Sequence, residues 1–500
     1  MAEPTEPARQ PGRVAVAAAP GRPPEWQRLC WMLVGVGLFA VMYFLPGLPD
    51  ATDPGGRVVG LSTEGRMALG LFLLAATWWV FEVLPIGVTA IAIAVLQALF
   101  QIRSARDAFT DFMDPAVWFI IGSVIIGMVF TKTGLTNRLA YRMLTIVGER
   151  TSRIYLGAFV MTAAMTLLMA HTAVAAAVFP LLMTIYALYE EDSRPTRFGK
   201  GLFIGMAFTA GAGSIITLLG AARGAVAIGF YRQLVGREVD FFELTYSLFP
   251  IGALMVILLW IYILLVFRPE QAVIPGLRDR ARRLHARLGP MKRNEILGLG
   301  ITLLAVGLMS ARSFVPAFAI LDKSAIIAGS MVLFFVVRIL RRDDLEALPW
   351  NIVLLFGGAM SLGLCLWQTG AAEWLAITSL SHLHGRETVA FIMGVGIFIM
   401  IMTNVIMNVA AIAISLPVAL VMAPYLGVSP DVILYVALTV AGMPFLFLVG
   451  AAPNAIAYQS RQFTAGEFFM AGVPASLIVI GVTWFFVAKI WPVMGMPVTG

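Results

Sequence analysis

The chain has 500 residues, of which 60% are hydrophobic and 13% charged, and its mean hydropathy is +0.88. Because a soluble domain is about one-quarter charged, this composition excludes a soluble enzyme and indicates a membrane protein. The 35 lysines and arginines outnumber the 28 acidic residues, a surplus that in an apolar chain marks cytoplasmic loops rather than a nucleic-acid partner. The two cysteines lie in apolar runs, which favours core packing over a disulfide framework or a cysteine-based metal site.

The N-terminal segment 1–28 differs from the rest of the chain. It contains six prolines and four arginines among small residues and has no long apolar core, so it is predicted to be a disordered cytoplasmic tail. A helix that crosses the membrane needs ~20 mostly apolar residues. Eleven later runs are predicted to be such spans: 29–46, 67–83, 86–100, 116–131, 201–222, 247–267, 296–311, 325–340, 350–367, 432–457 and 468–488.

Two further apolar segments, 154–189 and 387–424, contain internal polar breaks. Each is long enough to enter the membrane and turn back as a re-entrant hairpin. Irregular backbone at membrane depth must be buried in protein or line an aqueous cavity, so both hairpins are expected to border a functional site.

The charges of the loops alternate between basic and acidic. The basic loops 132–153 and 268–295 fall on the same side as the N-terminus, whereas 47–65, 101–115 and 370–387 carry mainly acidic residues. The positive-inside rule therefore predicts a cytoplasmic N-terminus and an external C-terminus, as in a bacterial inner membrane. The stretch 268–295 is interpreted as a solvated cytoplasmic linker; binding of anionic lipid or nucleic acid is the alternative.

An internal repeat relates the two halves of the chain. An odd number of crossings, five spans and one hairpin, separates the copies, so they are predicted to be inverted, as in many secondary transporters. Three segments recur in the same order: Thr133-Gly134 as Thr369-Gly370, 170–180 as 407–417, and 221–224 as 451–454, with offsets of 236, 237 and 230 residues.

Inverted repeats place substrate and ion sites near the midplane, where broken helices of the two copies meet. His171-Thr172 and Asn408 mark the two hairpin tips, and the glycine-rich stretches 209–224 and 441–454 mark interrupted helices. Such interruptions free carbonyl groups to face a cation and N–H groups to face an anion. The alternative is close helix packing, for which small residues are also common.

Three segments carry a resemblance to a known family: TWWVFEVLPIGVTA (77–90), DPAVWFIIGS with KTGLTNRLA (114–140), and AGMPFLFLVGAAPNAIA (441–457). From about residue 65 onward, the chain resembles the divalent anion/sodium symporter family of sulfate, dicarboxylate and citrate carriers. The resemblance implies an all-α polytopic inverted repeat of about eleven transmembrane helices and two re-entrant hairpins. It also implies a homodimer, an elevator mechanism and no cofactor other than Na+ as coupling ion.

The resemblance and the repeat together predict a division of the chain into a scaffold and a transport domain. The predicted parts are a tail (1–28), the first scaffold part (29–150), the first transport part (151–267), a basic linker (268–295), the second scaffold part (296–386) and the second transport part (387–492).

The chain departs from the family pattern at both tips. The family's Ser-Asn-Thr is replaced by Ala170-His171-Thr172 and by Met407-Asn408-Val409, and the first Pro-Pro-Asn becomes Ala222-Arg223-Gly224. The resemblance implies a retained second cation site and an altered first one. The residues expected to bind substrate are His171, Thr172, Arg223, Met407, Asn408, Val409 and Asn454, and those expected to bind the cation are Asn408, Gly442, Gly450, Ala451 and Pro453.

Arg223 is the most unusual of these residues. An arginine near the bilayer centre costs ~2.5–3.5 kcal/mol on insertion scales, which favours a function, although a side chain extended toward the interface near Tyr231 is the alternative. The hypothesis is that Arg223, with His171, takes the electrostatic place of the first sodium ion. The substrate is then expected to have a strongly anionic end near Thr172 and Arg223 and a less polar end near Met407 and Val409.

The predicted function is secondary active transport of small anions such as dicarboxylates or sulfate. The chain contains no HExxH motif and no Walker loop, and no cluster of carboxylates lies at membrane depth, so neither an enzyme nor a primary pump is expected. Three alternatives remain open at this point: a sodium-independent anion exchanger, a proton-coupled carrier and a non-transporting membrane receptor.

Overall fold

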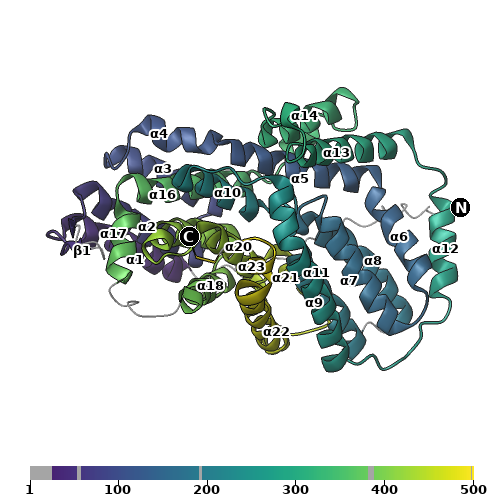
Figure 1. The fold of residues 1–500 in the computed structure, drawn as a ribbon. Coiled ribbons are helices and arrows are strands. Elements are labelled where there is room, and N and C mark those ends of the chain that lie inside the picture. The colour runs from purple at the N-terminus through teal and green to yellow at the C-terminus, as the bar shows by residue number, and fades with distance from the viewer. Residues whose placement is uncertain (1–24, 53–57, 191–193, 381–387, 497, 500) are drawn as a thin grey trace, which may run out of the picture.

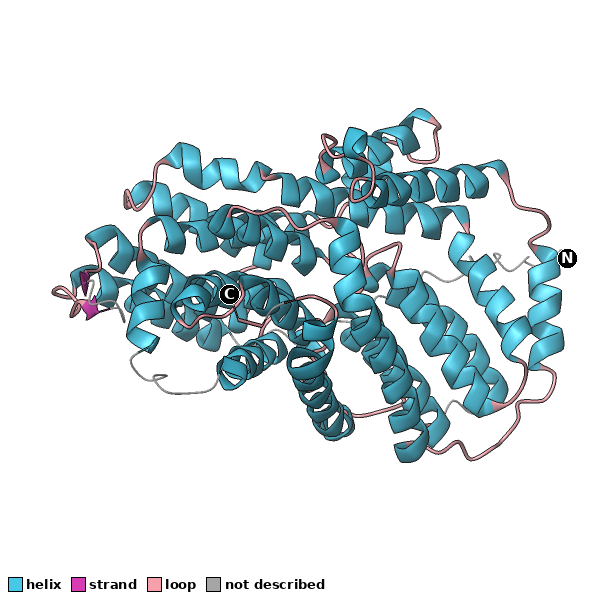
Figure 2. Ribbon diagram, viewed as in Figure 1, coloured by secondary structure: helices cyan, strands magenta, loops and turns pink. Residues whose placement is uncertain are grey.

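The computed structural model describes residues 25–499 apart from 53–57, 191–193, 381–387 and 497. Within these residues the chain is almost entirely helical, and only β1 (Ala51–Thr52) and β2 (Val58–Val59) form a two-stranded antiparallel sheet (Figures 1 and 2). Most of the predicted tail lies outside the described residues. Its last four residues already belong to α1 (Glu25–Phe44), which begins before the apolar run.

The helices fall into two series of the same order. The first series is α2 (Thr63–Val80), α3 (Ile86–Leu99), α4 (Ala105–Thr110), η1 (Asp111–Met113), α5 (Pro115–Thr133), α6 (Leu135–Val147), α7 (Thr151–Thr166), α8 (His171–Tyr189), α9 (Arg197–Gly213), α10 (Ala222–Val235) and α11 (Phe241–Val266). The linker helix α12 (Leu277–Arg287) follows. The second series is α13 (Arg293–Ala311), η2 (Pro316–Phe318), α14 (Lys323–Val336), α15 (Arg342–Glu346), α16 (Trp350–Gln368), α17 (Ala371–Leu380), α18 (Thr388–Val405), α19 (Asn408–Tyr425), α20 (Pro430–Ala441), η3 (Leu448–Gly450), α21 (Ala452–Tyr458) and α22 (Ala465–Phe485), followed by η4 (Phe486–Ile490) and α23 (Trp491–Val493).

Each of the eleven predicted spans contains a helix. Among the described residues, nine helices are long and apolar enough to cross a membrane, and α3, α14 and α20 are shorter apolar helices. The chain is therefore an all-α polytopic membrane protein. The runs 201–222 and 432–457 are not continuous helices, because α9 ends at Gly213 and α20 ends at Ala441, inside the predicted glycine-rich interruptions.

The two series pack against each other reciprocally. Helix α3 of the first series packs on α16 of the second, and its counterpart α14 packs on α5. In the same way α10 packs on α19, and α21 packs on α8. A duplication related by a two-fold axis produces this exchange of partners, as the repeat in the sequence predicts.

The repeat is also visible in how its helices begin and end. Helix α5 ends at Gly134, which has a left-handed φ of 87°, and the matching Gly370 after α16 has a φ of 73°. A residue in this conformation ends a helix, and glycine adopts it without a steric penalty. The hairpins α7–α8 and α18–α19 turn over the short segments 167–170 and 406–407, so His171 and Asn408 are the first residues of their second arms.

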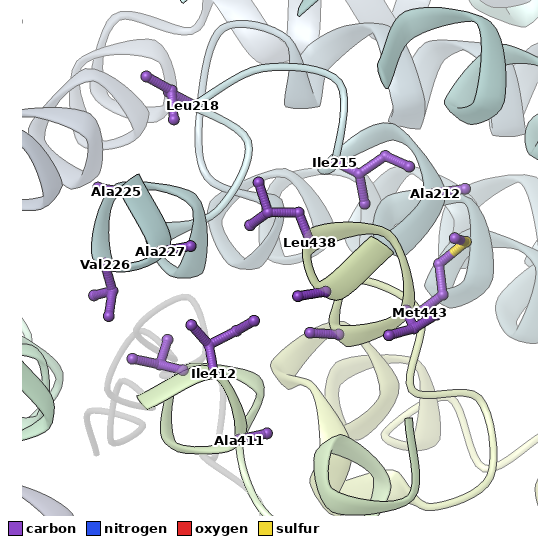
Figure 3. Close-up of a cluster of buried hydrophobic side chains, with 14 of the residues drawn as sticks. Ala212, Ile215, Leu218, Ala225, Val226, Ala227, Ala411, Ile412, Leu438 and Met443 are labelled. Atoms are coloured by element: carbon purple, nitrogen blue, oxygen red, sulfur yellow. The ribbon is translucent and has the colours of Figure 1, made fainter. Parts of the chain in front are cut away.

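Apolar side chains hold the broken helices together. Figure 3 shows Ala212 in the last turn of α9 and Ile215 just after it, beside Leu438 in the last turn of α20 and Met443 just after it. Val226 of α10 lies across from Ile412 of α19 in the same cluster. All these side chains are buried, so the interruptions in both helices are packed inside the protein.

Candidate functional site

A cavity of about 680 Å³ lies between the two hairpin tips and the helices α5 and α16. The tips contribute the starts of α8 and α19, and the broken helices contribute the starts of α10 and α21. Its wall includes Gly127, Met128, Thr131, Lys132, Ala170, His171, Thr172, Ala222, Asp344, Phe356, Met407, Asn408, Val409, Gly450, Ala451 and Ala452. The volume falls in the range of about 300–1,000 Å³ found for small-molecule sites.

Three helices of at least fourteen residues begin at this cavity, namely α8, α10 and α19. Their N-cap residues are Ala170, Ala221 and Met407, and none of these side chains accepts a hydrogen bond from the first turn. A helix start carries about half a positive charge in its exposed N–H groups, which makes it a site for anions. The convergence of three such starts gives the cavity a positive character without a dense cluster of basic side chains.

The first hairpin tip is tied to the interruption between α9 and α10. The backbone N–H of His171 donates to the carbonyl oxygen of Gly220 at 2.8 Å, and its Nδ1 lies 3.2 Å from the same oxygen. The Thr217 hydroxyl donates to the Leu167 carbonyl oxygen at 3.0 Å. His171 is 8% exposed and lines the cavity beside the half-buried Thr172.

The second tip is supported from inside its own hairpin. One turn before Asn408, the Asn404 side chain donates to the Met400 carbonyl oxygen and accepts from the Leu446 N–H, both at 2.7 Å. Asn404 therefore joins α18 to the interruption after α20. The Asn454 amide donates to the Pro444 and Phe447 carbonyl oxygens, at 2.8 and 3.1 Å. These hydrogen bonds join the start of α21 to the interruption that precedes it.

Arg223 lies behind the cavity wall and is 1% exposed. Its guanidinium donates to the Ser214 hydroxyl at 2.8 Å, and Ser214 in turn donates to the Gly211 carbonyl oxygen at 2.7 Å. A Cβ atom at Gly442 would come within 2.6 Å of Arg223 Nη2, so the guanidinium lies where α9 and α20 both end. Helix C-termini carry partial negative charge and stabilise a cation there. The alternative in which the side chain reaches the interface near Tyr231 is wrong.

The structure brings together most of the residues expected to bind substrate, but not all. Arg223 and Asn454 do not line the cavity: Arg223 faces the helix ends, and Asn454 is turned toward backbone carbonyls. Of the residues expected to bind a cation, Gly442 borders Arg223 and Pro453 is buried in the first turn of α21. The expected site residues that do line the cavity are His171, Thr172, Met407, Asn408, Val409, Gly450 and Ala451.

A family profile described as "Sodium:sulfate symporter transmembrane region" matches residues 30–497. The chain belongs to this family. Two curated relatives are named sodium-dependent dicarboxylate transporters: one from Staphylococcus saprophyticus, 25% identical over 93% of both chains, and one from Staphylococcus aureus, 26% identical over 87% of both. The family is one of membrane transporters, so this member is a secondary anion transporter and not an enzyme.

Two solved structures share the fold of this symporter family member. The Alcanivorax borkumensis YdaH transporter has 15% identity, a TM-score of 0.55, and coverage of 95% of this chain and 99% of its own. Neisseria gonorrhoeae MtrF, placed by its title in a class of antimetabolite efflux pumps, has 14% identity, a TM-score of 0.56 and coverage of 97% of both chains. Over the described residues of this family member, no group of three His, Cys, Asp or Glu side chains could hold a metal ion.

An ion pair on the cavity wall was missed in the sequence, because Lys132 counted only as a charge of the basic loop 132–153 and Asp344 was not considered. The Nζ atom of Lys132, at the end of α5, lies 2.5 Å from Oδ2 of Asp344 in α15, and both residues line the cavity. Burial acts to raise the pKa of Asp344, but the hydrogen bond from Lys132 and the Arg341 N–H lower it below its ordinary value. Asp344 is therefore ionised at neutral pH and pairs with Lys132, the lysine that the described residues place in the cavity wall. The lysine in the last turn of the long apolar helix α5 was the signal that could have identified it.

The tautomer of His171 leads to a prediction for the symporter. Because Nδ1 faces a carbonyl oxygen, this nitrogen carries a proton in the neutral ring, and an amide N–H can replace it. We expect His171→Gln to retain the dependence of anion uptake on pH between 5.5 and 8. The measurement is the initial uptake rate across this range, with His171→Leu as the variant that loses the donor. A flattened pH profile in the glutamine variant would show that His171 carries the coupled proton.

Proposed function

We propose that this chain carries small divalent anions, of the dicarboxylate or sulfate type, across a bacterial inner membrane, with its N-terminus in the cytoplasm. The observation that carries the proposal is the cavity at which the starts of α8, α10 and α19 converge, none of which has a side-chain N-cap. Such a site stabilises negative charge at the contact between the two repeats. The names of the curated relatives, which are dicarboxylate transporters coupled to sodium, agree with this chemistry.

The proposed movement is an elevator-type displacement of the transport domain against the scaffold. Both domains line the cavity. The transport parts 151–267 and 387–492 contribute the hairpin tips, and the scaffold parts contribute α5 and α16. A substrate held there lies at the boundary along which the two domains would slide. We propose that the scaffold also forms a homodimer, which would hold it still in the membrane.

For ion coupling, we propose a single sodium ion at the second tip and a fixed charge in place of the first. Near the second tip, Asn408, Gly450 and Ala451 line the cavity and offer oxygen atoms, which Na+ prefers as a hard cation. Arg223 lies instead at the ends of α9 and α20, where its charge faces two negative helix termini. A bound sodium ion next to this guanidinium would be repelled.

The cavity also bears on the orientation of the substrate. Lys132 offers a positive charge, which Asp344 partly balances, and Thr172 and His171 offer donors, whereas Met407 and Val409 give the second tip an apolar surface. Because Arg223 lies outside the cavity, we propose that Lys132 is the residue that faces the strongly charged end of the substrate. Desolvating a second carboxylate against Met407 and Val409 would be costly unless it reaches Asn408 or free backbone N–H groups.

The test is uptake of labelled succinate into proteoliposomes with and without a sodium gradient. We expect the rate of succinate uptake to rise hyperbolically with the sodium concentration, as it does when one sodium ion is coupled to each anion. We expect Lys132→Gln to raise KM about tenfold, the loss of one charge-assisted contact worth ~1.5–3 kcal/mol, while Lys292→Gln, at an exposed position that does not line the cavity, leaves KM unchanged.

The other outcomes identify the alternatives. Coupling to two or more sodium ions contradicts the role of Arg223. Counter-transport without any sodium effect indicates an exchanger, an inward proton current indicates proton coupling, and binding of succinate without accumulation indicates a receptor.

A further inference from the structure

A second hollow lies away from the tips, between α6 and α7. It has a volume of about 450 Å³, within the range of about 300–1,000 Å³ known for ligand pockets. It begins where α7 approaches α6 at Gly157, beside Val147, and extends to Leu168 next to the first hairpin tip. The lining side chains are apolar except for one: Phe130, Leu139, Arg142, Met143, Ile146, Val147, Val160, Met161, Ala164, Met165 and Leu168.

This groove opens on the outside of the protein. Ile146, Val160 and Leu139 in its walls are 75%, 48% and 41% exposed. Large apolar side chains exposed together mark a surface that meets lipid or a partner. None of the residues that line the groove also lines the cavity at the hairpin tips.

The positive charge near the groove lies on α6, which lines it, and on α12, which packs on α6 but contributes no lining residue. Arg142 is the single charged residue in the groove wall, it is exposed, and it forms no ion pair within the part of the chain that the structure describes. Helix α12 packs on α6 through Leu277 and Ala281 (Figure 1). Its other faces expose five arginines against one acid: Arg278, Arg280, Arg282, Arg283 and Arg287, with Asp279.

We propose that this groove binds an anionic phospholipid, with one acyl chain against the apolar wall and the phosphate on Arg142, while the arginines of the neighbouring α12 add to the positive charge around it. A free phosphate ion would leave the apolar wall uncovered. A neutral lipid would leave the arginine charges without a partner, and basic clusters beside a membrane attract anionic lipids. The inference does not depend on which anion the protein transports.

The experiment uses the full chain in phosphatidylcholine nanodiscs that contain a trace of phospholipid with a diazirine in its acyl chain. After illumination, mass spectrometry maps the labelled peptides. We expect the phosphatidylglycerol probe to label peptides of α6 and α7 several-fold more than the phosphatidylcholine probe does. Equal labelling by the two probes would overturn the proposal, because the groove would then be filled by any lipid.

Two variants separate the acyl chain from the phosphate. Ala164 is exposed and lines the groove, so Ala164→Phe fills it without displacing a buried contact and is expected to reduce labelling by both probes. Arg142→Gln is expected to lower phosphatidylglycerol labelling to the phosphatidylcholine level. Arg153→Gln is the matched control, since Arg153 is an exposed arginine of α7 outside the groove. Unchanged labelling in Ala164→Phe, or an equal loss in Arg153→Gln, would contradict the site.

Discussion

Arg223→Gln is expected to lower the initial rate of anion uptake about tenfold or more, while the protein still folds and inserts. The substitution removes a buried charge bonded to Ser214 and placed at the ends of α9 and α20. A hydrogen bond to a charged group contributes ~1.5–3 kcal/mol, and 1.4 kcal/mol corresponds to a factor of ten. Glutamine is shorter and removes the positive charge together with the hydrogen bond to Ser214, so the comparison with a variant that keeps the charge is needed to report on the charge itself.

Two variants serve as controls for this experiment. Arg223→Lys keeps the charge and is expected to retain a larger part of the uptake rate than glutamine. Arg342→Gln removes an arginine that is 87% exposed and is expected to leave uptake unchanged. Uptake in Arg223→Gln at the wild-type rate and with the wild-type sodium dependence would show that the charge has no part in transport.

Much of the architecture could be predicted from patterns in the sequence, namely the apolar runs, the glycine-rich stretches and the internal repeat. The two interruptions are rich in glycine, and the structure ends α9 and α20 inside them, at Gly213 and Ala441. The repeat predicted that segments 170–180 and 407–417 correspond, and both contain the first turn of a hairpin arm.

Directions of side chains could not be predicted in the same way. The sequence predicted that Arg223 lies at the start of a broken helix. The direction of its side chain, however, depends on the backbone conformation of the preceding loop, which sequence spacing does not give. In the structure the Arg223 side chain is directed away from the cavity and toward Ser214. Asn454 likewise donates to carbonyl oxygens of the interruption that precedes it, and the one at Pro444 is buried and needs a donor.

The pair Lys132–Asp344 shows a further limit. Its members are 212 residues apart and belong to different repeats. Asp344 lies outside the apolar helices, and the positive-inside rule explains Lys132, in the last turn of α5, without any site. Only the packing of α5 beside the segment before α16 brings the two charges together.

Gly442→Ala is expected to reduce uptake about tenfold and to lower stability by about 1–3 kcal/mol, the usual cost of overpacking a filled interior. The backbone at Gly442 has φ −74° and ψ −18°, which alanine adopts freely, so the effect is steric. The added Cβ would lie 2.3 Å from Ile215 Cγ2 and 2.6 Å from Arg223 Nη2. Thermal unfolding followed by tryptophan fluorescence, together with uptake, measures both effects.

The matched control for this substitution is Gly394→Ala in α18. A Cβ atom at Gly394 would meet nothing within 4 Å, so this change is expected to be neutral or to stabilise by about 0.4–1 kcal/mol. In the double variant Gly442→Ala with Arg223→Gln, the shorter glutamine side chain relieves part of the clash with the new methyl group. The stability loss of the double variant is therefore expected to be smaller than the sum of the losses of the two single variants. Strict additivity would indicate that the guanidinium does not lie against Gly442, and the placement of the fixed charge at the two helix ends would have to be abandoned.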